Sequence, residues 1–254
     1  MKTEDFFLTE DELTRYDRQI MIPGWSEQGQ KKIKSATIVV AGSGGLGSPS
    51  SIYLAAAGVG HLIIVDKDVF ELSNLNRQIL GWQKDIGRKK AEVAAEKLRA
   101  LNPDIQITPR VMEISQDNVV ELLEKADLVV DAMDNWATRF LLNKTCVDLN
   151  IPFIHAGVFG LYGQIMTIIP HKGPCLRCLL PETPKDVGKF PVLGATPGLF
   201  AMLQVMEALK ILIGIGEPLT GKMLLFDGSN MTVTRINVSR RPDCPVCASH
   251  KRSA

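Results

Sequence analysis

The segment from Thr37 to Gln78 constrains the fold more than any other part of this 254-residue chain. An apolar run over 38–41 leads into a glycine-rich turn, a small-residue segment over 50–58, and a second apolar run over 61–65 that ends at Asp66. Strand, glycine turn, helix and strand with a terminal acid are the fingerprint of a nucleotide-binding βαβ unit. The segment therefore predicts nucleotide binding without specifying the nucleotide.

The glycine turn has the sequence Gly42-Ser43-Gly44-Gly45-Leu46-Gly47. In such turns one glycine allows the tight bend, one lets the backbone approach phosphate, and one permits close contact between helix and strand. The N-terminus of the following helix presents unpaired N–H groups to an anion. Asp66, at the carboxyl end of the second strand, can accept hydrogen bonds from ribose hydroxyls.

A polar, non-periodic stretch, Glu71-Leu72-Ser73-Asn74-Leu75-Asn76-Arg77-Gln78, follows the second strand. Ligands bind at this edge of open α/β sheets. We expect the stretch to supply hydrogen bonds to a nucleotide, and a positive charge to its phosphates, from Ser73, Asn74, Asn76, Arg77 and Gln78. The alternative is an ordinary polar loop.

The periodicity of residues 87–101 predicts a helix with Lys89 and Lys90 in its first turn. Cations are not favoured at the positive end of a helix, so we expect one of these lysines to face an anion.

An apolar strand over 127–132 is followed by Met133-Asp134-Asn135. This is a second strand end that carries an acid. Asp134 can act as a magnesium ligand or substrate orienter, or it can be the N-cap of the helix expected over 136–149. Both roles can hold at once.

Strand and helix alternate over the first 150 residues, which predicts a doubly wound, Rossmann-like, mostly parallel sheet. The strand-rich remainder predicts mixed strands that carry a metal knot. We expect one domain over 1–254, made of a helical arm (12–35), a nucleotide-binding half (36–150) and a second half (151–254) with the metal knot.

Two features of the second half lead to further expectations. The proline-rich segment 181–197 predicts a crossing loop. The helix expected over 196–213 should place Leu199, Leu203, Met206 and Leu209 on its core side.

Composition is that of an ordinary α/β protein, with 45% hydrophobic, 22% charged and 6% aromatic residues. The net charge of +1 gives no basic field for nucleic acid. The polar N-terminus does not resemble a signal peptide, and no stretch approaches the roughly 20 consecutive apolar residues of a membrane span. We therefore expect a cytoplasmic protein that contacts neither nucleic acid nor membrane.

Four of the five cysteines form two C-x-x-C pairs, Cys175 with Cys178 and Cys244 with Cys247. Two such pairs can close a tetrahedral zinc site with no position left for water, which is a structural site. Free thiols and redox pairs are the alternatives. The fifth, Cys146, lies in a helical pattern, and we expect a buried cysteine rather than a nucleophile.

These motifs come in the same order as in the ThiF/MoeB/HesA family, the bacterial and archaeal relatives of ubiquitin-activating enzymes. The chain resembles that family from about Arg15 to Cys247. The resemblance implies an adenylyltransferase that uses ATP and Mg²⁺ to activate the C-terminal Gly-Gly carboxylate of a small ubiquitin-like sulfur-carrier protein, releasing pyrophosphate, in sulfur-containing cofactor biosynthesis.

The resemblance also implies roles for individual residues. Gly45 would lie on the phosphate loop and Asp66 would hold the ribose. Asn74 and Arg77 would contact phosphates, Lys90 would neutralise the transferring charge, and Asp134 would position magnesium, with Asn135 beside it. Arg18 matches an arginine that reaches into the ATP site of the neighbouring subunit, which implies a homodimer.

One departure concerns the crossing loop, where many members of the family carry a cysteine. Here residues 186–193 contain none. We therefore expect activation to stop at the adenylate, with sulfur delivered by an external sulfurtransferase or cysteine desulfurase; the alternative is that Cys146 acts instead.

Two other functions stay open. A nicotinamide- or flavin-dependent oxidoreductase fits the glycine turn and Asp66 equally well, but leaves Arg77, Lys90 and the cysteines unexplained. The adenylylated acceptor could also be a peptide or a modified tRNA base, for which the net charge gives no support.

Overall fold

The computed structural model describes residues 7–185 and 188–248, so Asp186 and Val187 of the crossing loop lie outside the described residues. Its helices are α1 (Glu10–Arg15), α2 (Asp17–Ile20), α3 (Ser26–Ser35), α4 (Gly47–Ala56), α5 (Lys90–Leu101), α6 (Val119–Leu123), α7 (Trp136–Asp148), α8 (Leu176–Leu179) and α9 (Ala195–Ile213). Two short 3₁₀ turns are η2 (Leu72–Asn74) and η3 (Gln83–Asp85). The strands are β1 (Thr37–Ala41), β2 (His61–Val65), β3 (Gln106–Arg110), β4 (Leu128–Asp131), β5 (Phe153–Phe159), β6 (Tyr162–Ile168), β7 (Lys222–Asp227) and β8 (Thr232–Asn237).

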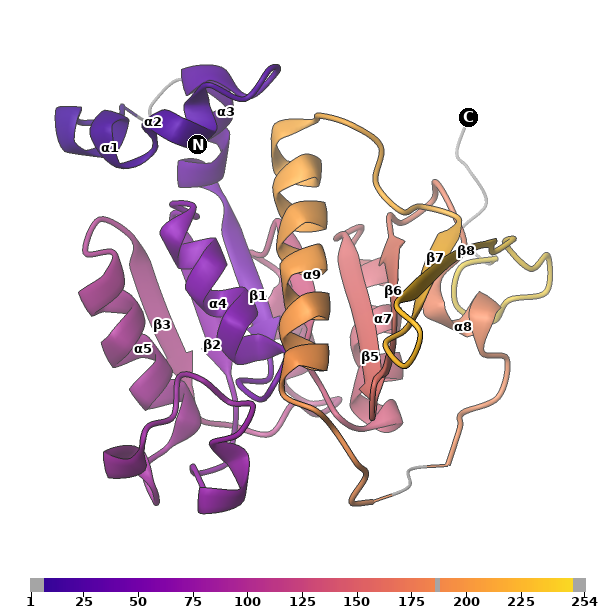
Figure 1. Cartoon of the computed structure of the whole chain (residues 1–254). Coiled ribbons are helices and arrows are strands. Elements are labelled where there is room, and N and C mark those ends of the chain that lie inside the picture. Colours follow the sequence, from indigo (N-terminus) through magenta and orange to yellow (C-terminus); the bar gives the residue numbers. More distant parts are fainter. Residues whose placement is uncertain (1–6, 186–187, 249–254) are drawn as a thin grey trace.

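The described strands form one sheet in the order β3-β2-β1-β4-β5-β6-β7-β8 (Figure 1). Strands β3 to β5 are parallel, and β6, β7 and β8 add antiparallel pairs. This confirms the predicted doubly wound, mixed sheet. The order reverses between β1 and β4, and a crevice opens beyond the carboxyl ends of strands at such a switch point.

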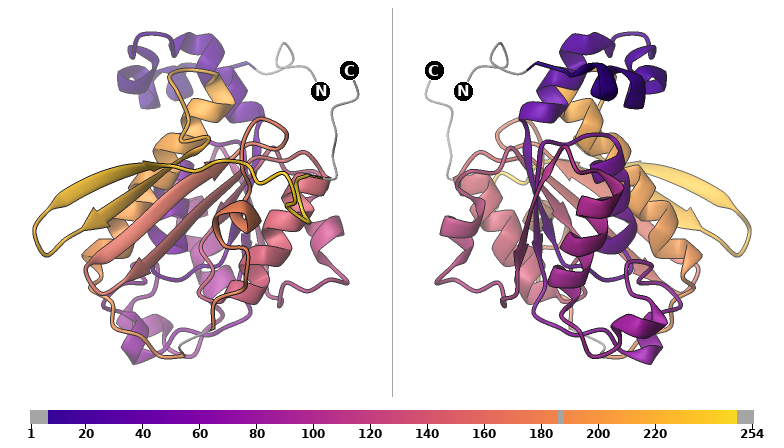
Figure 2. Two further views of the ribbon diagram at one scale, coloured as in Figure 1. Left: turned by 90° about the vertical axis from the view of Figure 1, so that its right-hand side faces the viewer. Right: turned by 90° about the vertical axis from the view of Figure 1, so that its left-hand side faces the viewer.

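Helices cover both faces of the parallel strands (Figure 2). Helices α4, α5 and α9 pack on one face, around a core that includes Ile38, Val40 and Phe200. The opposite face packs against α6 and α7, around Val39 and Leu142. The central strands read as continuous apolar runs because both of their faces are buried.

Helix α9 corrects one expectation from the sequence. Leu203 and Leu209 pack against the core as predicted, but Leu199 and Met206 are 41% and 54% exposed. The core side instead holds Gln204, which donates hydrogen bonds to the carbonyls of Asp131 (2.7 Å) and Ile154 (3.1 Å). The prediction for Leu199 and Met206 was wrong because α9 carries apolar side chains on all of its sides. The buried side is the one from which Gln204 reaches the strand carbonyls.

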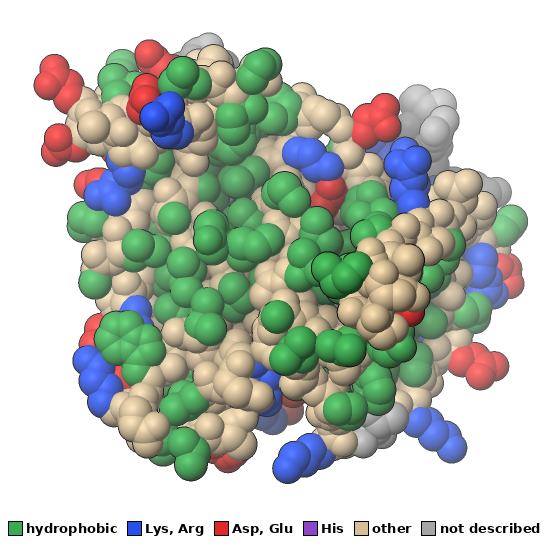
Figure 3. Space-filling view, in the orientation of Figure 1, with side chains coloured by type: hydrophobic (Ala, Val, Ile, Leu, Met, Phe, Trp, Pro, Cys, Tyr) green, Lys and Arg blue, Asp and Glu red, His purple; other side chains and the backbone are tan. Residues whose placement is uncertain are grey.

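Leu199 and Met206 are thus exposed, and many hydrophobic side chains are exposed on the side of the molecule where α9 and α4 lie together (Figure 3). Tyr53 of α4 is also 54% exposed. We call the surface formed by Tyr53, Leu199 and Met206 the α4–α9 face.

Helix α9 is also the one helix in the described part of the chain that is long and apolar enough, by composition, to cross a membrane. Half of that window is buried within the fold, where α9 packs against β5, β6 and α4. Gln204, Glu207 and Lys210 interrupt its apolar sequence. A helix that packs in the core is expected to be apolar, which explains the high hydropathy of α9.

The N-terminal arm, α1 to α3, lies at the amino end of the parallel strands, since α3 leads directly into β1 (Figure 1). Tyr16 fixes the arm to the body: it is 2% exposed, and its hydroxyl accepts a hydrogen bond from Asn102 Nδ2 at 2.9 Å. Gly58 makes room for this ring, because a Cβ there would lie 2.5 Å from Tyr16 Cζ.

Candidate active site

A cavity of about 940 Å³ opens at the carboxyl ends of β1 and β4, at the switch point of the sheet. Residues predicted as functional from five separate segments line it: Gly42, Gly44, Gly45, Asp66, Arg77, Gln78, Lys90, Asp134 and Asn135. The topology therefore brings together groups that lie up to 93 positions apart, from 42 to 135.

The glycine turn has the backbone that its sequence predicts. Gly42 has φ +102°, and a Cβ there would lie 2.6 Å from the carbonyl oxygen of Ala132, so glycine is required on both grounds. Gly47 begins α4. A Cβ on Gly47 would lie 1.9 Å from the carbonyl oxygen of Gly42, so this glycine provides the contact of helix with strand.

Asp66 links β2 to the glycine turn. Its carboxylate accepts hydrogen bonds from the N–H of Ser43 (2.8 Å) and of Asp68 (2.9 Å). Burial raises the pKa of Asp66 despite these hydrogen bonds. The side chain is thus held at the rim of the cavity with its acceptor oxygens oriented.

Lys90 is the lysine of the pair that lines the cavity. It is 6% exposed, and its ammonium lies 3.5 Å from the carboxylate of Asp68. Lys89 instead donates to the carbonyl of Lys67 at 3.2 Å. A nearly buried ammonium with one partly exposed counter-ion is arranged to meet a further anion.

Arg77 reaches the cavity from the polar stretch after β2. Its Nη1 donates to the carbonyl of Ser73 (2.9 Å) and to Oδ1 of Asn76 (3.0 Å). Ser73 and Asn76 do not line the cavity themselves. They hold the guanidinium that does.

Asn74 and Gln78 differ in their placement. Asn74 is 8% exposed, does not line the cavity, and its Oδ1 accepts from the N–H of Glu71 at 3.1 Å. Gln78 lines the cavity, and its buried Oε1 has no hydrogen-bond partner among the described residues. A buried acceptor without a partner in a cavity wall fits contact with a ligand.

The structure after β4 assigns the helix cap to Asn135 and not to Asp134. Asn135 is the N-cap of α7, since its Oδ1 accepts from the N–H of Thr138 at 2.9 Å. Asp134 is exposed and lines the cavity, so its carboxylate is available to a ligand.

The cavity extends from this polar end onto the antiparallel strands. There it is bounded by β5, β6, β7 and β8 and by the crossing loop, and the lining residues include Phe159, Tyr162, Phe190, Phe226, Thr232 and Thr234. Phe159 stacks on Phe190 with ring centroids 6.2 Å apart, which joins the loop to the sheet. One end of the cavity therefore carries both acidic and basic side chains, and the other end carries most of the aromatic ones.

Sequence reasoning did not identify a buried ionic group beneath this cavity. Asp131 and His155 are both fully buried, and His155 Nδ1 lies 2.7 Å from Asp131 Oδ2. Arg139, which lines the cavity, places its Nε 3.4 Å from the same oxygen. A histidine within the apolar strand 153–159 was the available signal, but its partner depends on which strands are neighbours.

Arg18 does not lie in this cavity. It is exposed on α2, in the arm at the amino end of β1, whereas the cavity lies beyond the carboxyl end of that strand (Figure 1). The same molecule cannot bring Arg18 to its own glycine turn without unpacking the arm.

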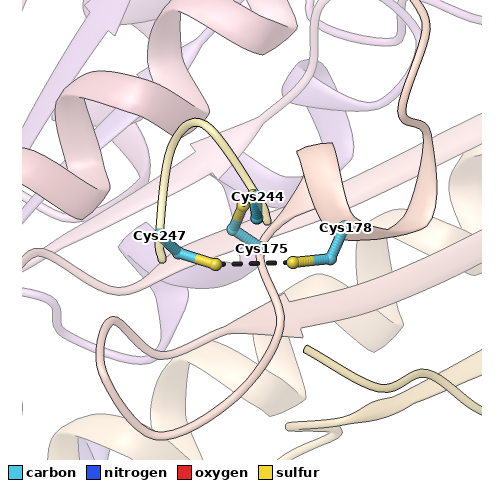
Figure 4. A group of neighbouring side chains, drawn as sticks. All are labelled: Cys175, Cys178, Cys244 and Cys247. Carbon is cyan, nitrogen blue, oxygen red and sulfur yellow. Dashed lines mark hydrogen bonds between the residues drawn. The ribbon is translucent and has the colours of Figure 1, made fainter. Parts of the chain in front are cut away.

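The four paired cysteines converge on one point, between the segment at α8 and the C-terminal segment (Figure 4). All four are buried, and their Sγ atoms lie within 4.8 Å of one another. The Sγ atoms of Cys175 and Cys244 are 3.7 Å apart, and those of Cys178 and Cys247 are 3.4 Å apart. A tetrahedron with zinc–sulfur bonds of about 2.3 Å has edges of about 3.8 Å, whereas a disulfide needs about 2.05 Å. The separations fit a four-thiolate metal site.

A backbone hydrogen bond to one of the four cysteines supports this assignment. The N–H of Arg241 donates to Sγ of Cys178 at 3.4 Å, as expected of a group that stabilises a thiolate ligand. Cys146 is separate and fully buried, and burial raises the pKa of its thiol. Its burial was predicted, and it disfavours a nucleophilic role.

Known proteins share this fold and sequence. The sequence pattern of the ThiF family matches residues 16–246. The SAMP-activating enzyme E1 of Haloferax volcanii is 43% identical over 241 residues, covering 93% of this chain and 89% of that protein. The sulfur carrier protein adenylyltransferase of Thermus thermophilus is 41% identical over 250 residues, covering 94% of this chain and 92% of that protein. The crystal structure of E. coli MccB with ATP matches with a TM-score of 0.82 at 27% identity, covering 92% of this chain and 74% of that one.

The match spans nearly the whole chain and includes the nucleotide end and three of the four clustered cysteines, Cys175, Cys178 and Cys244. It confirms the resemblance found from the ordered motifs, and the enzyme relatives identify the chain as an adenylyltransferase. The chain belongs to the ThiF family.

Proposed function

We propose that this protein uses ATP to adenylylate the C-terminal Gly-Gly carboxylate of a small ubiquitin-like sulfur-carrier protein. A carboxylate oxygen would attack the α-phosphorus, the bond to the β-phosphate oxygen would break, and pyrophosphate would leave. The observation that carries the proposal is the convergence of Arg77, Lys90 and Asp134 beside the glycine turn in one cavity. A carboxylate and a triphosphate repel each other, so the reaction needs cations and oriented donors.

Each lining residue has a role in this proposal. The backbone at Gly44 and Gly45 and the start of α4 would receive phosphates, and Asp66 would accept the ribose hydroxyls. Arg77 and Lys90 would neutralise the phosphates. Magnesium ions, held by Asp134 with the phosphate oxygens, would supply further neutralisation.

The remaining predicted residues take supporting parts. Gln78 would use its unpartnered Oε1 for a ligand donor. Ser73 and Asn76 would hold the Arg77 guanidinium, and Asn135 would orient Asp134 by capping α7. Asn74 would stabilise the loop that carries Ser73, Asn76 and Arg77. A direct contact of Asn74 with phosphate would require a different side-chain conformation.

The carrier's tail would enter over the antiparallel strands, so that residues 151–254 bind the carrier and residues 36–150 bind ATP, within one domain. The apolar and small side chains at that end of the cavity support an extended polypeptide tail. The names of the relatives favour a sulfur carrier over a peptide or a tRNA base. Sulfur-containing cofactor biosynthesis is the corresponding pathway class.

We propose that the enzyme acts as a homodimer in which Arg18 of one subunit completes the ATP site of the other. Two observations support this: Arg18 lies at the opposite end of β1 from its own cavity, and the α4–α9 face exposes Tyr53, Leu199 and Met206 (Figure 3). Exposed apolar side chains gathered on one side of a molecule are typical of an interface.

We also propose that Cys175, Cys178, Cys244 and Cys247 bind one structural Zn²⁺. The sulfur separations support four thiolate ligands, and a closed site would join the C-terminal segment to α8 without taking part in the chemistry.

The sulfur would come from an external sulfurtransferase or cysteine desulfurase. The crossing loop has no cysteine, and the buried Cys146 cannot meet the adenylate without unfolding of α7. We place the reaction in the cytoplasm, where ATP and such carriers are available.

The test is pyrophosphate exchange into ATP with a recombinant ubiquitin-like carrier from the same genome that ends in Gly-Gly. Exchange should require the carrier and Mg²⁺, and mass spectrometry should detect the carrier adenylate. A carrier lacking the last glycine should support no exchange. Binding of NADH with no carrier-dependent exchange would instead favour an oxidoreductase.

A further inference from the structure

A chain of three polar side chains runs from the core to the wall of the cavity. Asp131 ends β4, and its Oδ2 is 2.7 Å from Nδ1 of the buried His155 in β5. On the other side of the ring, His155 Nε2 lies 3.4 Å from Nε2 of Gln164 in β6. Gln164 lines the cavity.

The chemistry of the first pair fixes the protons of the histidine. A carboxylate accepts hydrogen bonds, so Nδ1 carries the proton that lies between His155 and Asp131. Complete burial lowers the pKa of His155 despite the nearby Asp131, which keeps the ring neutral. Nε2 then carries no proton and can only accept.

The orientation of Gln164 follows from this. Its amide nitrogen must face the ring, because only the NH₂ group can donate to an unprotonated Nε2. The carboxamide oxygen, Oε1, therefore turns away from His155.

The position of Gln164 makes this oxygen useful. Gly157 pairs directly with Gln164 across β5 and β6. A Cβ at 157 would lie 3.5 Å from Gln164 Nε2 and 3.4 Å from Arg139 Nη1, so the missing side chain leaves space beside both groups. On its other side Gln164 pairs with Leu225 of β7, which also lines the cavity.

Resting on the function proposed above, we propose that Gln164 accepts a hydrogen bond from a main-chain N–H of the substrate's C-terminal tail, and that the Asp131–His155 pair holds its carboxamide in the accepting orientation. Gln164 is then a specificity-determining residue for an extended polypeptide, and His155 is a positioning residue. A small free carboxylic acid lacks the amide N–H and loses this contact.

The test compares wild-type protein with Gln164→Met, His155→Phe and the double variant in carrier-dependent pyrophosphate exchange. Gln164→Met should raise the KM for the carrier about 3- to 10-fold, which corresponds to the loss of one neutral hydrogen bond. The Kd for ATP should stay within about twofold, because the nucleotide contacts other residues. Gln106→Met, at an exposed position on β3, is the matched control and should change neither constant.

The double variant tests the positioning role. If His155 acts through Gln164, His155→Phe should raise the carrier KM in the wild-type background and add nothing to Gln164→Met. Additive losses, or an equal weakening of ATP binding, would show that His155 is only structural and would overturn this part.

An unchanged carrier KM in Gln164→Met would overturn the whole inference while the activity of the wild-type enzyme still stands. Absence of exchange in the wild-type enzyme itself would overturn the proposed function, and the inference with it.

Discussion

Gly47 begins α4 so close to Gly42 that a Cβ on residue 47 would lie 1.9 Å from the Gly42 carbonyl oxygen. Both contacting atoms are held by backbone, so neither can move aside. This approach lets α4 start directly at the glycine turn, whose Gly44 and Gly45 line the cavity.

Gly47→Ala should therefore destabilise the protein by about 3 kcal/mol, near the upper end of the usual cost of overpacking. Gly198→Ala is the matched control: no atom lies within 4 Å of a Cβ there, and alanine in the helix α9 should stabilise by about 0.5–1 kcal/mol. Urea unfolding measures both changes. Equal stability of the two variants would contradict the close packing described for Gly47.

Arg77→Ala and Asp134→Ala should each slow pyrophosphate exchange by about 10- to 1000-fold, because each removes an electrostatic stabiliser of the transferring phosphate. Both residues line the cavity without supporting the core, so the melting temperature should hardly change. Lys125→Ala, an exposed cation that does not line the cavity, serves as control. Normal exchange in either cavity variant refutes its assigned role.

Cys244→Ser should release the proposed zinc and lower the melting temperature more than it lowers the exchange rate at low temperature. The cysteine cluster joins the C-terminal segment to α8, away from the cavity, so its loss should weaken the fold first. Metal content by atomic emission and thermal unfolding check this. One zinc retained per chain in the variant would rule out the four-cysteine site.

Subunits carrying Arg18→Ala and Arg77→Ala should each lose most of their exchange activity alone and regain part of it when mixed. Random mixing makes half of the dimers hybrid, each with one complete site of two, so activity should reach about one quarter of wild type. The measurement is exchange after subunit mixing at equal concentrations. No recovery, with hybrids verified by mass spectrometry, means that Arg18 does not act across the interface.

His155 should make the folded state sensitive to acid. Burial lowers its pKa in the folded state, while the unfolded chain has the ordinary value of about 6.5. As the pH falls below about 6.5, the unfolded state binds a proton that the folded state excludes, so the free energy of unfolding should fall by up to about 1.4 kcal/mol per pH unit. Urea titrations of wild type and His155→Phe between pH 5 and 8 should differ in this slope. If the free energy of unfolding has the same pH dependence in both proteins, His155 does not contribute to the acid sensitivity.

Local sequence was sufficient for the features that depend on neighbouring residues. The turn from Gly42 to Gly47, the acid at Asp66 and the two cysteine pairs each have a spacing set by one turn or one strand end. The same spacing rules predicted the alternation of helices and strands. A doubly wound sheet then has its crevice at a known edge, which is why the predicted lining residues meet there.

Only the tertiary structure showed which distant side chains are hydrogen-bond partners and which face of a helix is buried. Asp131, His155 and Gln164 meet only because β4, β5 and β6 are adjacent in a particular register. The choice of Asn135 rather than Asp134 as helix cap depends on one backbone turn. Helix α9 carries apolar residues on all sides, so its sequence could not distinguish the buried face from the exposed one; the strand carbonyls that bind Gln204 did so. Patterns along the chain report local geometry, whereas contacts between distant segments depend on packing that no short pattern encodes.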